Sequence, residues 1–333
     1  MIPEDVSFSP GLTQIAVEYQ NKELIADRVL PPIPHDRKTG KNKSYSTYDI
    51  YGIEGGLLGP NSVADEVDHE VTETSFALDD YGYKGWVSQE AIDNADAPID
   101  PRAKIVRTVT NKVLLRREKR VAEAVFNVAN YAAGNQADVN AAWVPTAPTF
   151  DIWGALLTGI DACSARPNVF VVDLATFRAM QRNTTILSAI KGTLAPQFVE
   201  QAVGPGKTGA PGIPDSVFCP ALAQALGVDV CLIGSAWYAS SKKGQTLTKG
   251  RIWSNTSTGA GRGAAAVLRV SKDQTEDIVW AMQMFWKQPL RVLSWFNPDR
   301  GADGSWAHKV IETTKVVLIA NDAGYLWRDT LVT

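Results

Sequence analysis

Few residues in this 333-residue chain have the types and spacing that catalysis or metal binding requires. The three histidines, His35, His69 and His308, lie far apart, and no pair has the spacing of a metal site or a catalytic triad. The acidic run Asp65–Glu70 could bind a divalent cation, but it lacks the residue order and the glycine of an EF-hand loop. We therefore expect no catalytic residue, no metal site and no cofactor.

One segment is similar to a phosphate-binding loop. Residues 204–209 read GPGKTG, like the end of a Walker A motif, but Gln201 stands where the first glycine of that motif belongs. The residues before the segment have a helical pattern, whereas the motif follows a strand. We expect a mobile loop here and not a nucleotide site.

The cysteines and the apolar residues indicate where the chain is found. Cys163, Cys219 and Cys231 are an odd number of thiols without a Cys-x-x-Cys pair, which predicts reduced side chains in a reducing compartment. The first residues contain no apolar signal segment, and no run of about 18 apolar residues could span a membrane. The sequence thus predicts an intracellular, soluble chain with no membrane partner.

Charged residues are unevenly distributed, although the formal net charge is only −3. Residues 51–100 contain twelve acidic residues and one lysine, Lys84, a local balance of −11. Repeated glycines and a strand pattern at 68–76 predict that this segment is a projecting hairpin. Its candidate acidic contact residues are Asp65, Glu66, Asp68, Glu70 and Glu73.

Residues 101–131 have the opposite charge and the apolar periodicity of an amphipathic helix. Asp100 is the expected N-cap, Pro101 the first helical residue and Gly134 the stop signal. Some thirty helical residues would extend about 45 Å. Eight basic residues against two acidic ones give a balance of +6. The candidates for a subunit contact or a lumen-facing basic surface are Arg102, Lys104, Arg107, Lys112, Arg116, Arg117, Lys119 and Arg120.

The remaining patterns predict a second packed region. Residues 167–181 have the pattern of a buried strand followed by a helix. Strands dominate after residue 251, with separate β-rich runs at 309–312 and 315–320. Three prolines at 31, 32 and 34 keep the N-terminal arm extended and exclude it from the centre of a sheet. Most of the ten tryptophans are expected in the core or at subunit contacts, because basic residues are not interleaved with them as in a base-stacking platform.

Five segments, in order along the chain, resemble tailed-bacteriophage major capsid proteins. They are NKELIADRVLP at 21–31, EKRVA at 118–122, NVANY at 127–131, RPNVFVV at 166–172 and AGYL at 323–326. The resemblance implies an α+β chain with the Hong Kong 97-like phage capsid fold, which has an N-arm, an extended β-hairpin loop, a long spine helix with a peripheral β-sheet, and an axial α/β domain. The implied ranges are 1–45 for the arm, 46–90 for the extended loop, 91–160 for the peripheral domain with the spine helix, 161–275 for the axial domain and 276–333 for the closing strands of the peripheral domain.

The resemblance also implies a function without enzymatic activity. It implies a structural subunit that assembles with itself, as hexamers and pentamers, into the icosahedral shell that encloses the double-stranded DNA of a tailed bacteriophage. Such a protein is found in the virion after assembly in the bacterial host cytoplasm, with a portal as a further partner and a decoration protein as a candidate one. Some relatives join subunits covalently through a loop lysine, but Lys84 is the only lysine in residues 51–100, so we expect non-covalent contacts. Others have a scaffolding segment before the arm, and here we expect a separate scaffolding protein.

Two hypotheses account for the opposite charges. In the first, the acidic loop lies near the basic spine helix of a neighbouring subunit and fixes its register. In the second, the helix faces the lumen and partly neutralises packaged DNA without sequence preference. An encapsulin-like nanocompartment shell, and a less favoured soluble hydrolase with scattered carboxylates, stay open as alternatives to a phage shell.

Overall fold

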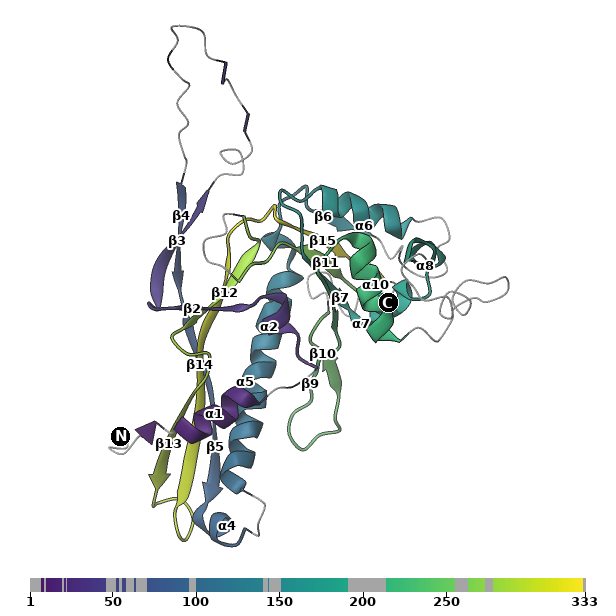
Figure 1. The fold of residues 1–333 in the computed structure, drawn as a ribbon. Helices are drawn as coiled ribbons and strands as arrows, with labels where there is room; N and C mark the ends of the chain where they lie inside the picture. Colours follow the sequence, from purple (N-terminus) through teal and green to yellow (C-terminus); the bar gives the residue numbers. More distant parts are fainter. Residues whose placement is uncertain are drawn as a thin grey trace.

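In its described residues, the computed structural model contains two large β-sheets connected by one long helix, and two two-stranded pairs, β3–β4 (Thr39–Tyr45 with Val71–Ala77) and β9–β10 (Trp237–Ala239 with Lys249–Arg251). The β3–β4 pair points away from both large sheets (Figure 1). It describes residues 7–8, 10–19, 21, 23–45, 52–53, 56–57, 63, 71–95, 100–139, 143, 151–190, 214–254, 263–272 and 278–331. The acidic run 65–70 and the glycine-rich segment 204–209 lie outside these residues.

The first sheet is built around one long strand. Its strands are β1 (Ser7–Phe8), β2 (Pro32–His35), β5 (Asp79–Ser88), β12 (Ala281–Trp286), β13 (Arg291–Asn297) and β14 (Ser305–Leu318). β13 and then β12 pair with successive halves of β14, and β5 also pairs with β14. The sequence predicted separate strands at 309–312 and 315–320, but β14 is continuous.

The N-terminal arm adds its strands to this sheet from outside. β1 pairs with β13, and β2 pairs in parallel with β12 at the end of the strand order. The edge position of β2 agrees with its prolines, which cannot donate ladder hydrogen bonds to two neighbours. Between these strands lie two helices, α1 (Pro10–Glu18) and α2 (Ala26–Val29).

The long helix α5 (Pro101–Val125) packs on one face of the first sheet. The Asp100 side chain accepts a hydrogen bond from the Arg102 backbone at 2.8 Å, so the predicted N-cap is confirmed. Val106, Val109 and Val113 are buried against Val292 and Val310 of the sheet, with Ala16 of α1 in the same cluster.

The end of α5 was predicted too late. The helix has 25 residues, about 37 Å at 1.5 Å per residue, and it ends at Val125, not near Tyr131. The Asn130 amide donates to the Ala124 carbonyl at 2.7 Å, and the Tyr131 hydroxyl donates to the Val125 carbonyl at 2.7 Å. These side chains satisfy the last helical carbonyls, and a short 3-10 turn (Val128–Asn130) follows.

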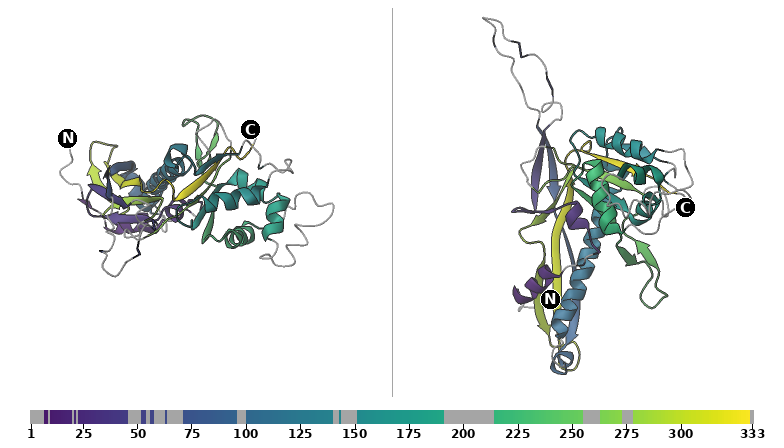
Figure 2. Two further views of the ribbon diagram at one scale, coloured as in Figure 1. Left: turned by 90° about the horizontal axis from the view of Figure 1, so that it is seen from above. Right: turned by 45° about the vertical axis from the view of Figure 1, so that its right-hand side comes forward.

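The second sheet is buried on both faces. Its order is β6 (Gln136–Asp138), β15 (Gly324–Arg328), β11 (Ala265–Leu268), β7 (Val169–Asp173) and β8 (Val230–Gly234). Phe170 and Val172 of β7 pack among the helices α6 (Ile152–Asp161), α8 (Thr184–Ile190) and α10 (Asp215–Leu226). Val169 and Val171 point to the opposite face, where α2 and the C-terminal end of α5 cover them. In Figure 2 the teal and green helices form their own layer, apart from the blue helix α5.

The remaining elements are short. They are β3 (Thr39–Tyr45), β4 (Val71–Ala77), α4 (Gln89–Asp93), α7 (Leu174–Met180), β9 (Trp237–Ala239) and β10 (Lys249–Arg251). β3 and β4 form an antiparallel pair that projects from the body (Figure 1). β4 overlaps the strand predicted at 68–76, whereas β3 lies before the segment 51–100 that was predicted to form the hairpin.

Several elements lie in a different layer from the one that the ranges drawn from the sequence imply. β6, α6 and β15 were placed with the peripheral ranges but lie in or on the second sheet, and β5 was placed in the extended loop but lies in the first sheet. The physical reason is long-range pairing: β15 binds between β6 and β11, and β5 binds along ten residues of β14.

Candidate functional site

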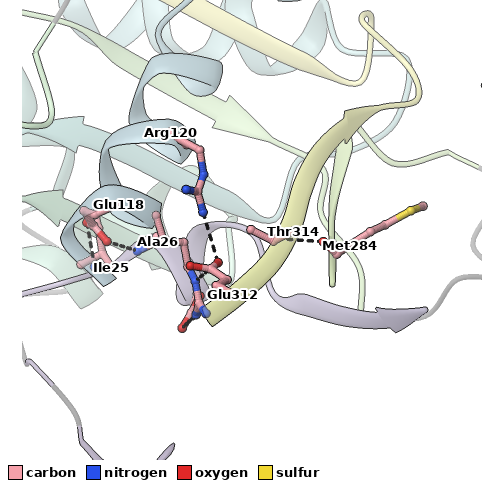
Figure 3. A network of polar contacts seen from close by, with 9 residues as sticks. Ile25, Ala26, Glu118, Arg120, Met284, Glu312 and Thr314 are labelled. Carbon is pink, nitrogen blue, oxygen red and sulfur yellow. Dashed lines mark hydrogen bonds and ion pairs between the residues drawn. The ribbon is translucent and has the colours of Figure 1, made fainter. Parts of the chain in front are cut away.

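The part of the molecule richest in buried charge lies where the arm crosses α5. The Glu118 carboxylate accepts hydrogen bonds from the Ile25 and Ala26 backbone amides at 2.9 and 2.8 Å (Figure 3). It also accepts one from the Trp253 indole at 2.5 Å. Glu118 is fully buried. One carboxylate therefore joins the arm, the helix and the loop that follows β10.

A second set of ion pairs adjoins Glu118. The Arg117 guanidinium contacts Asp27 of α2 at 2.8 Å and Glu312 of β14 at 2.7 Å. Arg120 contacts the same Glu312 at 3.2 Å, and its guanidinium lies 3.7 Å from the centroid of the Tyr81 ring. These contacts hold the arm and two neighbouring strands of the first sheet, β5 and β14, to one turn of α5. A groove of about 550 Å³ between α1, α2 and α5 ends on this turn.

Burial perturbs the charges of this network. It raises the pKa of Glu118, although the backbone and indole donors partly oppose the rise. It lowers the pKa of Arg120, while Glu312 acts in the opposite direction. The network connects the arm, α5 and β14, although Arg120 Nη1 and Glu312 Oε2 are buried without a hydrogen-bond partner in the described part of the chain.

The eight basic candidates on α5 divide into two groups. Arg117 and Arg120 make the ion pairs within the subunit, Arg102 lies over the Trp306 ring at 4.8 Å, and Lys119 is 3.7 Å from Glu123. The other four are exposed and have no ion pair among the residues that the structure describes: Lys104, Arg107, Lys112 and Arg116. We call this exposed group the basic stripe; its four side chains are open to contact with another molecule.

The acidic candidates are only partly within the described chain. Glu73 of β4 pairs with Lys41 of β3 at 2.6 Å, so it serves the hairpin, and its hydrogen bond raises the pKa of Lys41. The other four lie outside the described residues: Asp65, Glu66, Asp68 and Glu70. Among the described residues, Glu73 is thus the one acidic candidate, and its ion pair is with Lys41 and not with a basic candidate of α5.

A group of residues on the first sheet was missed from the sequence. Trp86 and Trp295 meet edge to face across β14 with centroids 6.1 Å apart. Lys84 and Arg300 lie over the Trp86 ring at 5.6 and 4.2 Å. Lys84 and Trp86 stand on either side of Gly85 along β5, and Gly85 faces α5. Because successive residues of a strand point to opposite faces of the sheet, this cluster lies on the face away from α5. Basic and aromatic side chains are thus interleaved across strands, although they are not interleaved along the sequence.

Metal and membrane chemistry have little support in the described residues. That part of the chain contains no group of three or more histidine, cysteine or carboxylate side chains able to hold a metal ion. It also contains no helix that is long and apolar enough to cross a membrane. The buried charges among the described residues hold structural elements together, as expected in a structural protein.

Comparisons with known proteins agree with that interpretation. No model of a known protein family matches the chain. The major capsid protein of Pseudomonas phage JBD67 is 26% identical over 321 residues, which cover 96% of both chains. The chain is similar, over nearly its whole length, to a phage major capsid protein.

Solved structures show that it also shares the capsid protein fold. A phage-related protein from Bordetella bronchiseptica RB50 superposes with a TM-score of 0.71 at 18% identity, over 99% of this chain and 100% of that one. The capsid of Cyanophage P-SCSP1u gives a TM-score of 0.55 at 9% identity, over 93% and 89%. The resemblance inferred from the five sequence segments is confirmed at the level of a mixed helix and sheet fold found in phage capsid proteins.

Proposed function

We propose that this chain is the major capsid subunit of a phage, a structural protein that assembles with copies of itself into a closed shell. The observation that carries the proposal is the collinear similarity to a phage major capsid protein over 96% of both lengths. Similarity over nearly the whole chain includes the arm, the long helix and both sheets, and so it is not confined to one shared motif.

The structure supports assembly on physical grounds. β3 and β4 pair with each other in a separate two-stranded sheet, and an isolated hairpin is marginally stable in water. Ile53, Leu57 and Val63, between these strands, are 97%, 96% and 88% exposed. Apolar side chains on a projecting hairpin are stabilised when a neighbouring subunit covers them.

The finer architecture follows the Hong Kong 97-like arrangement in our proposal. The arm is the segment through β2, the extended loop is the hairpin β3–β4 with its connection, and α5 is the spine helix. The first sheet forms the peripheral domain, and the second sheet with α6, α8 and α10 forms the axial domain. This assignment moves β6, α6 and β15 into the axial domain, because they pair or pack there.

Partners follow from the same proposal. They are copies of the chain in hexamers and pentamers, a separate scaffolding protein, a portal, packaged double-stranded DNA held by non-specific contact, and a decoration protein as a candidate. The virion is the final location, after assembly in the host cytoplasm. An encapsulin-like shell around protein cargo is the alternative function.

Microscopy of the purified full chain tests the proposal. Size-exclusion chromatography with negative staining is expected to show capsomers or shells of megadalton mass. A stable monomer under conditions that support assembly of related capsids, including co-expression with a scaffolding protein, would contradict it. Nuclease-protected DNA inside particles from infected cells separates a phage shell from a nanocompartment.

The basic stripe on α5 is the best candidate surface for the charge hypotheses. Its side chains are exposed, whereas Arg117 and Arg120 are committed within the subunit, so a test at those two positions would measure folding. We propose Lys112→Glu with Arg116→Glu, and Lys242→Glu with Lys243→Glu on the exposed loop after β9 as the matched control. Loss of shells in the first variant alone supports a subunit contact. Normal empty shells that retain less DNA support a lumen-facing surface.

A further inference from the structure

Two cysteine side chains face each other in the second sheet region. The Sγ atoms of Cys219 on α10 and Cys231 on β8 are 3.2 Å apart. Both are free thiols; Cys231 is buried and Cys219 is partly exposed. A disulfide has an S–S length of about 2.05 Å, so a relative shift of about 1 Å brings the sulfurs to bonding distance.

The local fold keeps these thiols together. α10 ends at Leu226, Gly227 takes the left-handed conformation with φ of 69°, and the chain returns to begin β8 at Val230. α10 therefore lies against β8, and residues 220–230 separate the two cysteines along the sequence. β8 is the last strand in the order of its sheet and pairs with β7. A bond between the sulfurs would fasten a helix to the edge of the sheet.

We propose that Cys219 and Cys231 are an oxidation site, and that they close to an intrachain disulfide once the chain leaves a reducing compartment. With oxidised glutathione, the Cys219 thiolate attacks one sulfur and releases one glutathione as its thiol. The Cys231 sulfur then loses its proton, attacks the Cys219 sulfur and displaces the second glutathione. Two thiols are oxidised to one disulfide, and one molecule of oxidised glutathione is reduced to two.

The order of attack follows from the surroundings of each thiol. The hydrogen bond with Cys219 and burial raise the pKa of Cys231, so it holds its proton until its neighbour has been activated. Cys163 is the third thiol; its Sγ donates to the Gly159 carbonyl at 3.3 Å, and burial raises its pKa to about 12. A thiol of that pKa has little thiolate near neutral pH, so Cys163 is the internal reference that stays reduced.

Thiol counting on the full-length folded chain tests the proposal. The chain is incubated with oxidised glutathione, denatured, treated with an alkylating agent and analysed by intact and peptide mass spectrometry. The expected result is one alkylated thiol per chain, at Cys163, and a cross-linked pair of peptides that contain Cys219 and Cys231. The intact mass before alkylation falls by two hydrogen atoms, about 2 Da. A chain unfolded before oxidant is added shows how the thiols react without the native contact.

Variants separate proximity from general reactivity. In Cys163→Ala the cross-link is expected to form unchanged, with no alkylated thiol left. In Cys219→Ser the cross-link is expected to disappear without transfer to Cys163. Three alkylated thiols in the oxidant-treated wild type, a stable glutathione adduct at Cys219, or a cross-link to Cys163 would each overturn the proposal.

Hydrogen exchange tests what the bond does. Because a cross-link restricts the opening of the segment it closes, exchange across residues 215–234 is expected to slow after oxidation and to recover on reduction. The Cys219→Ser chain treated in the same way should show no change. Equal exchange in the reduced and cross-linked wild type would show that the bond does not fasten α10 to β8.

Discussion

At the scale of single residues, one histidine makes the first sheet sensitive to pH. His308 lies on the face of β14 beneath the start of α5, with Nδ1 2.8 Å from the Ser294 hydroxyl. Its Nε2 is buried and has no hydrogen-bond partner in the described part of the chain. Burial lowers the pKa of His308, Arg102 lowers it further, and Asp100 acts in the opposite direction. The folded state therefore favours the neutral ring.

This lowered pKa predicts a loss of stability on acidification. The unfolded chain takes up the proton near the ordinary value of 6.5, before the folded chain does, so stability that is complete above this value falls as the pH drops towards the folded pKa. His308→Gln removes the titration and should flatten the dependence of the unfolding free energy on pH in that window. Urea unfolding of the dissociated subunit at a series of pH values measures it. His35→Gln, at the partly exposed end of β2, is the control substitution.

The Glu118 carboxylate predicts a second effect, on the arm. Both oxygens of Glu118 accept hydrogen bonds, whereas the amide nitrogen of Gln cannot accept one, so Glu118→Gln leaves a buried donor unpaired. The expected cost is about 1–3 kcal/mol. Hydrogen exchange at Ile25 or at Ala26 should become faster, because the two amides bond different oxygens of Glu118 and the single oxygen of Gln can replace only one of them. Glu123→Gln on the exposed side of the same helix is the control, and an equal effect there would contradict the role given to Glu118.

The positions of these charged residues could be predicted only in part. Arg117 is four residues from both Val113 and Val121, so the apolar periodicity already placed it on the buried face of α5. The same periodicity places Lys112 and Arg116 on the exposed face of α5. The count of charges in the sequence had treated all eight basic residues as one group. The acceptors Asp27 and Glu312 are 90 and 195 residues away, and local patterns contain no information on such pairs.

At the scale of elements, a glycine sets how closely α5 approaches the first sheet. A Cβ atom at Gly85 of β5 would lie 2.4 Å from Ile105 Cγ1 and 3.0 Å from Val109 Cγ2. Cγ1 is bonded directly to Cβ of Ile105 and is not the flexible end of a side chain, so either the Ile105 rotamer or the helix must shift. We expect Gly85→Ala to destabilise the subunit by about 1–3 kcal/mol through overpacking.

Denaturant unfolding measures this effect, and Gly134→Ala is its control. Nothing lies within 4 Å of a Cβ atom at Gly134, so this change should leave the unfolding midpoint near the wild-type value. Unchanged stability in Gly85→Ala would show that α5 is not held at this distance.

The elements themselves were predicted best where a local signal defines them. The start of α5 follows from Asp100 and Pro101, and the edge position of β2 follows from its prolines. The predicted end of α5 was wrong, because hydrogen bonds from Asn130 and Tyr131 decide where the helix stops. The predicted division of β14 into two strands was wrong, because pairing with β5 keeps it continuous. Each of those depends on the folded chain, whereas a periodic pattern extends until a breaker stops it.

At the scale of the whole molecule, the buried ion pairs separate what one subunit needs to fold from what many subunits need to assemble. On α5, the Arg117 side chain contacts the arm and the first sheet, whereas the preceding residue, Arg116, is exposed to solvent. Arg116 and Arg117 are adjacent in the sequence and have the same charge. They therefore form a matched pair that tests both functions of the helix in one experiment.

Arg117→Leu is expected to destabilise the subunit, because it leaves the buried Glu312 with Arg120 alone and removes the contact with Asp27. Breaking a buried ion pair from one side costs about 3–5 kcal/mol. Arg116→Leu should leave the unfolding free energy of the subunit near the wild-type value, since an exposed charge without an ion pair contributes little. Its effect is expected instead in the yield of shells or in their DNA content. Denaturant unfolding of the dissociated subunit and electron microscopy of the particles give the two readouts. If both variants lowered subunit stability equally, α5 would not divide into an inner face that folds the chain and an outer face that meets other molecules.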